Sequence, residues 1–282
     1  HKDLFRKYNP EAVIVSSTGT LDYDHYFMRE AGFFGSKVIT IVQSWDNPSS
    51  KGYNGYFPDL IFAWTDNMKN ELETFLDIKS ENIIVGGVPH FDNYIDQKFF
   101  FERDIFFKNF NLDLSKKLIF YASRSPSMYP WNPEIIKLLA EAIKRNRFSV
   151  PTQLIVRVHP NHYIKKHISD DINYTVQDKN MSNYEMLESE YPDLHFNYPQ
   201  VKVANEKNST NLANSFDIND SETKILSSLL KYSDVVVNLF STINIEASIF
   251  DLPIVNVGFN GGLKSPSSNV RHDIKFDERQ YH

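Results

Sequence analysis

The sequence predicts an α/β protein made of two Rossmann-like lobes, each with a parallel β-sheet. Short apolar runs rich in β-branched residues alternate with segments of helical periodicity, and strands that are apolar throughout indicate a sheet covered on both faces. The alternation stops after residue 95 and restarts near residue 115. We therefore expect an amino-terminal lobe over 1–95, a linker helix over 96–114, and a carboxyl-terminal lobe over 115–282.

Each strand is predicted from an apolar run, and each helix from apolar residues spaced three or four apart. The expected strands are 11–17, 37–43, 60–64, 83–85, 118–122, 153–158, 194–196, 235–238 and 254–257. The expected helices are 23–31, 67–76, 97–111, 133–145, 223–232 and 243–250. The polar region 169–222 gives little signal beyond one strand, and the first lobe is short enough that we expect it to be incomplete.

Composition excludes several classes of protein. The 282 residues are 41% hydrophobic and 23% charged, which is typical of a packed globular chain. The net charge of −6 argues against a general nucleic-acid-binding protein. There is no cysteine, so neither a disulfide framework nor a thiolate metal site is possible. We expect a cytoplasmic protein, with peripheral contact at the inner face of the cell membrane as an option.

Three strand ends of the second lobe carry groups that suit an anion. In open parallel sheets, ligands bind where the strands end. Arg124 follows the strand 118–122, and a guanidinium there can bind phosphate. Arg157 and His159 close the strand 153–158, and protonation of His159 near neutrality would strengthen a phosphate contact. For each residue the alternative is a surface or turn residue with no ligand.

The third strand end leads into a helix through Ser241 and Thr242. Either residue is expected to cap this helix, whose first amides would then face an anion. Glu246 lies one turn after Thr242 and so shares its helix face. The alternative is a simple cap with a solvated glutamate. Together the three strand ends predict a site for a diphosphate.

At these residues the chain resembles glycosyltransferases of the GT-B architecture, in particular the CDP-glycerol glycerophosphotransferases and bacterial surface-polysaccharide transferases. The resemblance rests on His159-Pro160, on Ser241-Thr242, and on first-lobe segments around Gln43–Asn47 and Gly87–Pro89. It implies that these motifs hold the nucleotide phosphates and that Glu246 binds the ribose. It also implies transfer of a sugar or polyol phosphate from a nucleotide-sugar or CDP-polyol donor to a glycan or lipid-linked acceptor.

The resemblance further implies that the first lobe is the acceptor side and holds the catalytic base, while the second lobe binds the donor nucleotide. Asp46 is the first choice, followed by His25 and Asp22, while Lys51 and Trp45 are further cleft residues. For Asp46 a turn-forming role before Pro48 is as well supported. The segment His162, Lys165, Lys166 and His167 is expected to form a basic face that is either solvated or in contact with an anionic acceptor. Neither a cofactor nor a metal ion is expected.

Two other functions stay open from the sequence. A non-hydrolysing sugar-nucleotide 2-epimerase shares the two-lobed plan, although we find no convincing set of acid and base residues around a sugar carbon. A non-catalytic nucleotide-binding module of a polysaccharide assembly complex is the other alternative.

Overall fold

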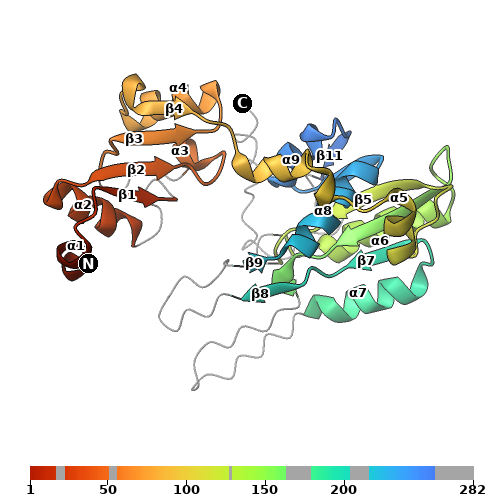
Figure 1. Ribbon diagram of the computed structural model, residues 1–282. Coiled ribbons are helices and arrows are strands. Elements are labelled where there is room, and N and C mark those ends of the chain that lie inside the picture. Colours follow the sequence, from red (N-terminus) through yellow and green to blue (C-terminus); the bar gives the residue numbers. More distant parts are fainter. Residues whose placement is uncertain (17–22, 51–55, 127–128, 163–178, 204–215, 258–282) are drawn as a thin grey trace, which may run out of the picture. The chain divides into compact units, whose positions relative to one another are not determined.

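The computed structural model describes residues 1–16, 23–50, 56–126, 129–162, 179–203 and 216–257, which form two compact units (Figure 1). The first unit is His1–His90 and the second is Phe91–His282. The division lies before the expected one because Phe91 and Tyr94 pack against the core of the second unit.

The first unit contains a four-stranded parallel sheet in the order β1-β2-β3-β4. Its strands are β1 (Ala12–Val15), β2 (Lys37–Ile41), β3 (Leu60–Ala63) and β4 (Ile83–Val85). Its α-helices are α1 (Lys2–Tyr8), α2 (Asp24–Phe34), α3 (Asn47–Ser50) and α4 (Asp66–Leu76), and the 3-10 turn η1 (Ser80–Asn82) precedes β4. The expected strands and the helices near residues 23 and 67 are thereby confirmed.

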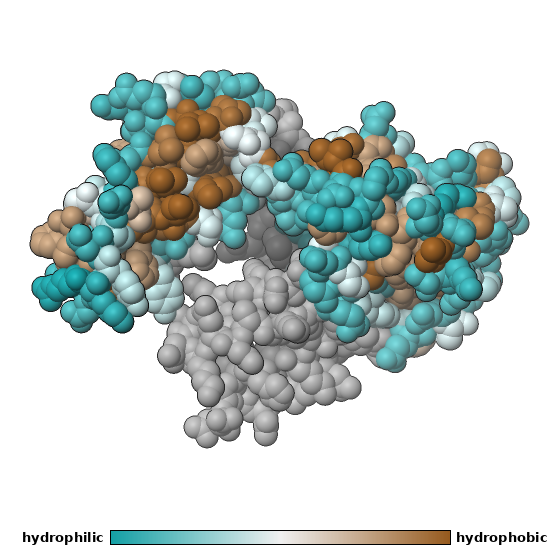
Figure 2. Space-filling view, in the orientation of Figure 1, coloured by the Kyte–Doolittle hydropathy of each residue, from teal (hydrophilic) through white to brown (hydrophobic). Residues whose placement is uncertain are grey.

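One face of this sheet is packed and the other is open in the described residues. Parallel strands taken in sequential order by right-handed connections carry their crossover helices on a single face. Val38 and Ile61 on that face are fully buried against helical residues such as Met28 and Leu72. The opposite face carries a row of exposed apolar side chains: Ile14, Ile41 and Ile84. Figure 2 shows this apolar surface gathered over the sheet of the first unit.

The second unit contains a five-stranded parallel sheet in the order β11-β10-β5-β6-β7. The strands are β5 (Lys117–Ala122), β6 (Thr152–Arg157), β7 (Leu194–Asn197), β10 (Val235–Asn238) and β11 (Ile254–Asn256). The chain starts in the middle with β5, moves outward to β7, and crosses back to β10. The order therefore reverses between β5 and β10, the position at which doubly wound sheets bind ligands.

Helices cover both faces of the second sheet (Figure 1). The helices α6 (Asn132–Lys144) and α7 (Lys179–Glu190) contribute to one apolar core, which includes Ile136 and Tyr184. The helices α5 (Arg103–Asn109), α8 (Asp220–Tyr232) and α9 (Ile243–Ile249) contribute to the other. This two-sided burial explains why the strands are apolar along their whole length.

The segment expected as one helix over 97–111 is broken in the structure. The 3-10 turns η2 (Pro89–Tyr94) and η3 (Gln97–Phe99) precede an extended stretch, and only Arg103–Asn109 is α-helical. Tertiary hydrogen bonds hold the stretch extended: the Phe101 amide donates to Ser228 Oγ (2.9 Å), and the Tyr232 hydroxyl donates to the Phe101 carbonyl (2.6 Å). Phe106 and Phe107 are buried in the core of the second unit, so this segment is part of that unit.

The polar region that the sequence left unassigned contains α7 and a two-stranded antiparallel sheet of β8 (Val201–Val203) and β9 (Phe216–Ile218). Among the residues that the structure describes, no helix has the length and apolar character needed to cross a membrane.

Candidate functional site

The three strand ends identified from the sequence lie side by side along one edge of the second sheet, the edge formed by the carboxyl ends of its strands. Ala122 at the end of β5 pairs in register with Asn238 of β10 and with Arg157 of β6. Neighbouring strands in a sheet lie about 4.8 Å apart, so the three loops that follow these residues start within about 10 Å of one another. The order of the strands reverses between two of the three, β5 and β10.

Arg124 connects two of these loops across the reversal. Its Nη1 donates to the carbonyl oxygens of Leu239 (3.0 Å) and Phe240 (2.8 Å), which follow β10. Phe240 has φ of 36°, a left-handed conformation that non-glycine residues adopt only under constraint. The guanidinium is thus held at the switch point, the place at which sheets of this class bind ligands.

His159 is fixed in a defined tautomer beside Arg124. Its backbone amide donates to Ser123 Oγ (2.8 Å), and its ring Nδ1 accepts from the Asn161 amide (3.1 Å). Because an amide can only donate, Nδ1 carries no proton, and the neutral ring has its proton on Nε2. Partial burial, with His162 and Arg124 nearby, lowers the pKa of His159 to about 4. The imidazole is therefore neutral near pH 7, so protonation does not strengthen a phosphate contact there, and such a contact would use the neutral Nε2–H.

This lowered pKa predicts that the stability of the protein falls in mild acid. The ordinary histidine pKa near 6.5 applies to the unfolded chain, so between pH 6.5 and 4 the unfolded state binds the proton that folded His159 excludes. The effect should be about 1–2 kcal/mol after allowance for the ring's partial exposure. Denaturant midpoints at pH 7.5 and 4.5 should differ less for His159→Gln than for the unmodified protein, and equal differences would contradict this tautomer and pKa.

The start of α9 differs from the expected anion cradle. Thr242 occupies the cap position with helical dihedral angles and no side-chain cap, and Ser241 Oγ is 3.5 Å from the Ile243 amide. The amides of Asn244 and Ile245 donate to the Ser241 and Thr242 carbonyls, each at 2.9 Å. These two amides are engaged within the turn, and the Ser241 and Thr242 hydroxyls are further groups of the turn that can bind a ligand. Thr242 is exposed and Ser241 is half-buried.

Glu246 is not the solvated surface charge that the alternative interpretation assumed. Burial raises the pKa of Glu246, while a hydrogen bond from Tyr94 and the charge of Arg157 act in the opposite direction. Burial likewise raises the pKa of the Tyr94 hydroxyl, with Glu246 adding to the effect. A half-buried carboxylate that accepts a hydrogen bond from the Tyr94 hydroxyl at the first turn of α9 can also accept one from a ligand hydroxyl.

Arg157 forms a buried ion pair. Its Nη2 lies 3.1 Å from Glu222 Oε2, and the two side chains are 12% and 3% exposed. The other carboxylate oxygen accepts from the Gln200 amide (2.9 Å), and Nη1 of Arg157 donates to Asn197 Oδ1. The expected nucleotide contact of Arg157 thus competes with interior partners that already bind its guanidinium.

The candidates in the first unit lie in local contacts. Asp46 accepts from Ser44 Oγ (2.6 Å) and Ser50 Oγ (2.9 Å), an arrangement that matches the turn interpretation. His25 packs against Tyr26 with ring centroids 4.3 Å apart, and Trp45 is half-buried. The other two candidates, Asp22 and Lys51, lie outside the described residues.

The chain carries one Asp-x-Asp triplet, Asp22-Tyr23-Asp24. Such a triplet is the kind of sequence that can bind a metal–nucleotide complex, so the sequence does not argue against a metal site. In the described part of the chain, no group of three or more His, Asp or Glu side chains is placed to hold a metal ion.

For several residues at this edge, the sequence-based prediction gave no role or a wrong environment. His162, expected on a solvated basic face, is 2% exposed, and its Nε2 lies 3.0 Å from the Arg124 carbonyl. The remainder of that basic segment, Lys165, Lys166 and His167, is outside the described residues. Asn132 and Asn161 also join these loops, through Arg124 and Ser125 respectively. An asparagine directly before a proline at a helix start was the only sequence signal for Asn132.

Comparison with known proteins gives structural relatives only. No protein-family model and no curated protein matches the chain. Among solved structures, UDP-GlcNAc 2-epimerase from Neisseria meningitidis, bound to UDP-GlcNAc, has a TM-score of 0.55 at 15% identity, over 90% of this chain and 61% of that one. UDP-GlcNAc 2-epimerase from Methanocaldococcus jannaschii has a TM-score of 0.54 at 15% identity, and the match covers 90% of this chain and 63% of that one. MnaA of S. aureus, solved with UDP, has a TM-score of 0.58 at 15% identity, and the match covers 100% of this chain and 71% of that one.

The chain thus spans less than two thirds of the first two relatives. Identity of 15% establishes a shared fold and no more. The expected α/β architecture with two Rossmann-like parallel sheets is confirmed, and it is the GT-B-like fold of these sugar-nucleotide proteins.

Proposed function

We propose that the carboxyl edge of β10, β5 and β6 binds the diphosphate of a nucleotide-activated sugar or polyol. The observation that carries this proposal is the meeting of Arg124 with the Leu239–Phe240 loop at the point where the strand order reverses. His159 adds a neutral Nε2–H donor, Ser241 and Thr242 add hydroxyls, and Glu246 is the candidate acceptor for a ribose hydroxyl. The UDP-GlcNAc and the UDP bound in two of the structural relatives support this ligand class.

The proposed reaction is transfer of the sugar or polyol phosphate to a surface polysaccharide or lipid-linked acceptor. In sugar transfer, the bond between the anomeric carbon and the diphosphate oxygen breaks, and negative charge develops on the departing nucleotide. Arg124 and the His159 Nε2–H would stabilise this charge because they are held in place before the reaction. The acceptor hydroxyl loses its proton to a general base, for which Asp46 remains our candidate.

The comparisons favour sugar-nucleotide 2-epimerisation as a second candidate function, because two of the three solved structures cited above are UDP-GlcNAc 2-epimerases. Incubation with UDP-GlcNAc separates the two. Recovery of a 2-epimeric sugar supports epimerisation, and release of UDP that depends on an added glycan acceptor supports transfer. Binding without either product supports the non-catalytic module.

Ligand binding itself is tested by thermal unfolding with CMP, CDP, UDP, GDP and their sugars. A ligand at 100 times its Kd adds about 2.7 kcal/mol to the stability of the folded state, which raises the Tm by several degrees. We expect at least one nucleoside diphosphate to raise the Tm of the unmodified protein. If none does, there is no donor site.

The role of Asp46 is tested by Asp46→Asn. We expect turnover to fall at least 100-fold with donor affinity unchanged, because general acid–base catalysis contributes about 100- to 10,000-fold. The Tm should change little, since the amide oxygen can still accept from Ser44 or Ser50. Ser50→Ala removes one partner of Asp46 and is the matched control; equal turnover for both variants and the unmodified protein would assign Asp46 to the turn alone.

A further inference from the structure

Asn132, the first residue of α6, makes hydrogen bonds within the protein with both its side-chain oxygen and its side-chain nitrogen. It is fully buried, and its Oδ1 accepts from the Tyr121 hydroxyl (2.9 Å) and the Arg124 amide (3.1 Å). Its Nδ2 donates to the carbonyls of Arg124 (3.0 Å) and Tyr129. The side chain therefore holds both backbone polar groups of Arg124.

Arg124 links Asn132 to the loop that follows β10, on the other side of the point where the strand order reverses. Arg124 is fixed at its backbone by Asn132 and bonds at its guanidinium to the Leu239 and Phe240 carbonyls. The Arg124 carbonyl also lies 3.0 Å from His162 Nε2, on the loop that carries His159. A shift of the Arg124 backbone would move the guanidinium away from its two carbonyl partners.

We propose that Asn132 is a positioning residue that sets the place of the Arg124 guanidinium and, through it, the conformation of the loop from Leu239 to Thr242. The consequence for phosphate binding rests on the function proposed above, whereas the coupling between Asn132 and this loop does not. Asn132 contacts the Arg124 backbone and would act on a phosphate only through Arg124.

The substitution Asn132→Asp tests this with almost no change of size. A carboxylate still accepts from Tyr121 and from the Arg124 amide, but it cannot donate. Its second oxygen would face the carbonyls of Arg124 and Tyr129, acceptor against acceptor, in a buried place. The backbone at Arg124 or at Tyr129 must then move.

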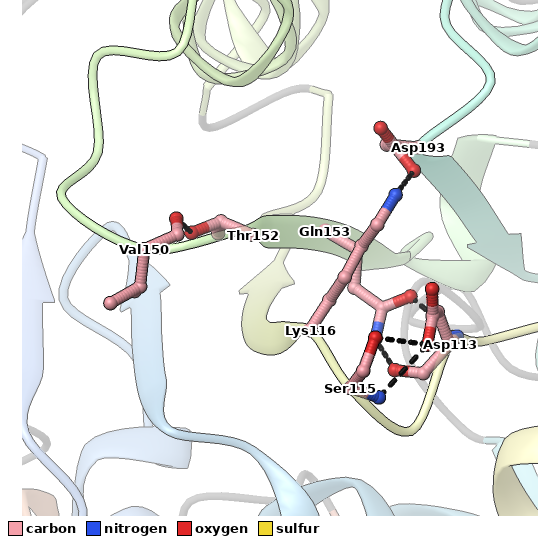
Figure 3. A network of polar contacts seen from close by, with 7 residues as sticks. All are labelled: Asp113, Ser115, Lys116, Val150, Thr152, Gln153 and Asp193. Atoms are coloured by element: carbon pink, nitrogen blue, oxygen red, sulfur yellow. Dashed lines mark hydrogen bonds and ion pairs between the residues drawn. The ribbon is translucent and has the colours of Figure 1, made fainter.

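Gln153 offers a matched control at the opposite edge of the same sheet. It is 1% exposed, its Oε1 accepts from the Asp113 amide and its Nε2 donates to the Asp113 carbonyl, both at 2.8 Å. Figure 3 shows these two hydrogen bonds, a backbone clamp between Gln153 and Asp113, beside Ser115 and the Lys116–Asp193 ion pair. Gln153→Glu makes the same amide-to-carboxylate change on the same kind of backbone clamp, but at the amino ends of the strands.

The first measurement needs no ligand. Hydrogen-exchange mass spectrometry of peptides covering 238–245 should show at least tenfold faster exchange in Asn132→Asp and in Arg124→Ala. The double variant should be no faster than Arg124→Ala alone, because both changes act through one contact. Gln153→Glu should leave these peptides unchanged even if it lowers the Tm equally. Additive effects, or acceleration by Gln153→Glu, would overturn the proposal.

The second measurement concerns affinity, with UDP, UMP and uridine as probes. We expect Asn132→Asp to weaken UDP binding at least tenfold and uridine binding less than twofold, with no further loss in the Arg124→Ala background. Uridine and UDP weakened equally would show a general structural role and overturn the positioning role. If the unmodified protein binds none of the probes, the proposed function fails, while the exchange experiment still decides on the positioning.

Discussion

Replacing Arg157 by alanine is expected to lower the free energy of unfolding by about 3–5 kcal/mol, since removal of one partner leaves a buried charge without compensation. Glu222 is 3% exposed, and one of its carboxylate oxygens has the Arg157 guanidinium as its ion-pair partner. Chemical denaturation of the variant at pH 7.5 measures the loss. The double variant Arg157→Met, Glu222→Gln should recover part of the stability, because no buried charge remains at that position.

The exposed pair of Lys117 and Asp234 provides the control. These residues are 61% and 38% exposed and form an ion pair of 2.7 Å at the amino end of the same sheet. Lys117→Ala should cost less than about 1 kcal/mol, as exposed pairs usually do. If Arg157→Ala instead keeps the original stability and abolishes nucleotide binding, Arg157 is a ligand-binding residue, as the sequence suggested.

Replacing Arg124 by methionine is expected to weaken UDP binding by about 10- to 100-fold, which corresponds to the loss of one charged hydrogen bond of about 1.5–3 kcal/mol. The same change removes the donor of the Leu239 and Phe240 carbonyls, so the Tm should also fall. Calorimetric titration with UDP and with uridine separates the two effects. Only the charged ligand should lose affinity.

Arg124→Lys is the conservative control for this prediction. It keeps the charge, but a single ammonium cannot reproduce the planar fork that binds two carbonyls and a phosphate together. Its UDP affinity should lie between those of the methionine variant and the unmodified protein, with a steeper salt dependence than the methionine variant. Unchanged UDP affinity in both variants would remove Arg124 from the proposed site.

The strands were predictable from sequence because each is an apolar run. In the second sheet both faces are buried, so its strands are apolar throughout and show no alternation of polar and apolar residues. The segment 97–111 was misassigned because its backbone is set by partners more than 100 residues away, Ser228 and Tyr232, whose positions no local pattern encodes. Tertiary contacts commonly override local helix preference in this way.

At the candidate site, sequence reasoning identified the strand ends but not the side-chain geometry. The register of the parallel sheet brings Arg124, His159 and Ser241 to one edge, as strand-end logic predicts. The neutral tautomer of His159 depends on the Asn161 amide, and the buried state of His162 depends on Tyr184 and the Arg124 carbonyl. Such contacts are set by packing and leave no local sequence signal.

The most direct test is hydrogen exchange of the unmodified protein with and without saturating UDP. We expect protection in peptides covering 123–126, 159–162 and 239–245, at the carboxyl ends of β5, β6 and β10. The amino edge of the same sheet holds a cavity of about 270 Å³, lined by residues that include Lys116, Phe148 and Asp193. Protection confined to that cavity, or found nowhere, would contradict a nucleotide site at the carboxyl edge.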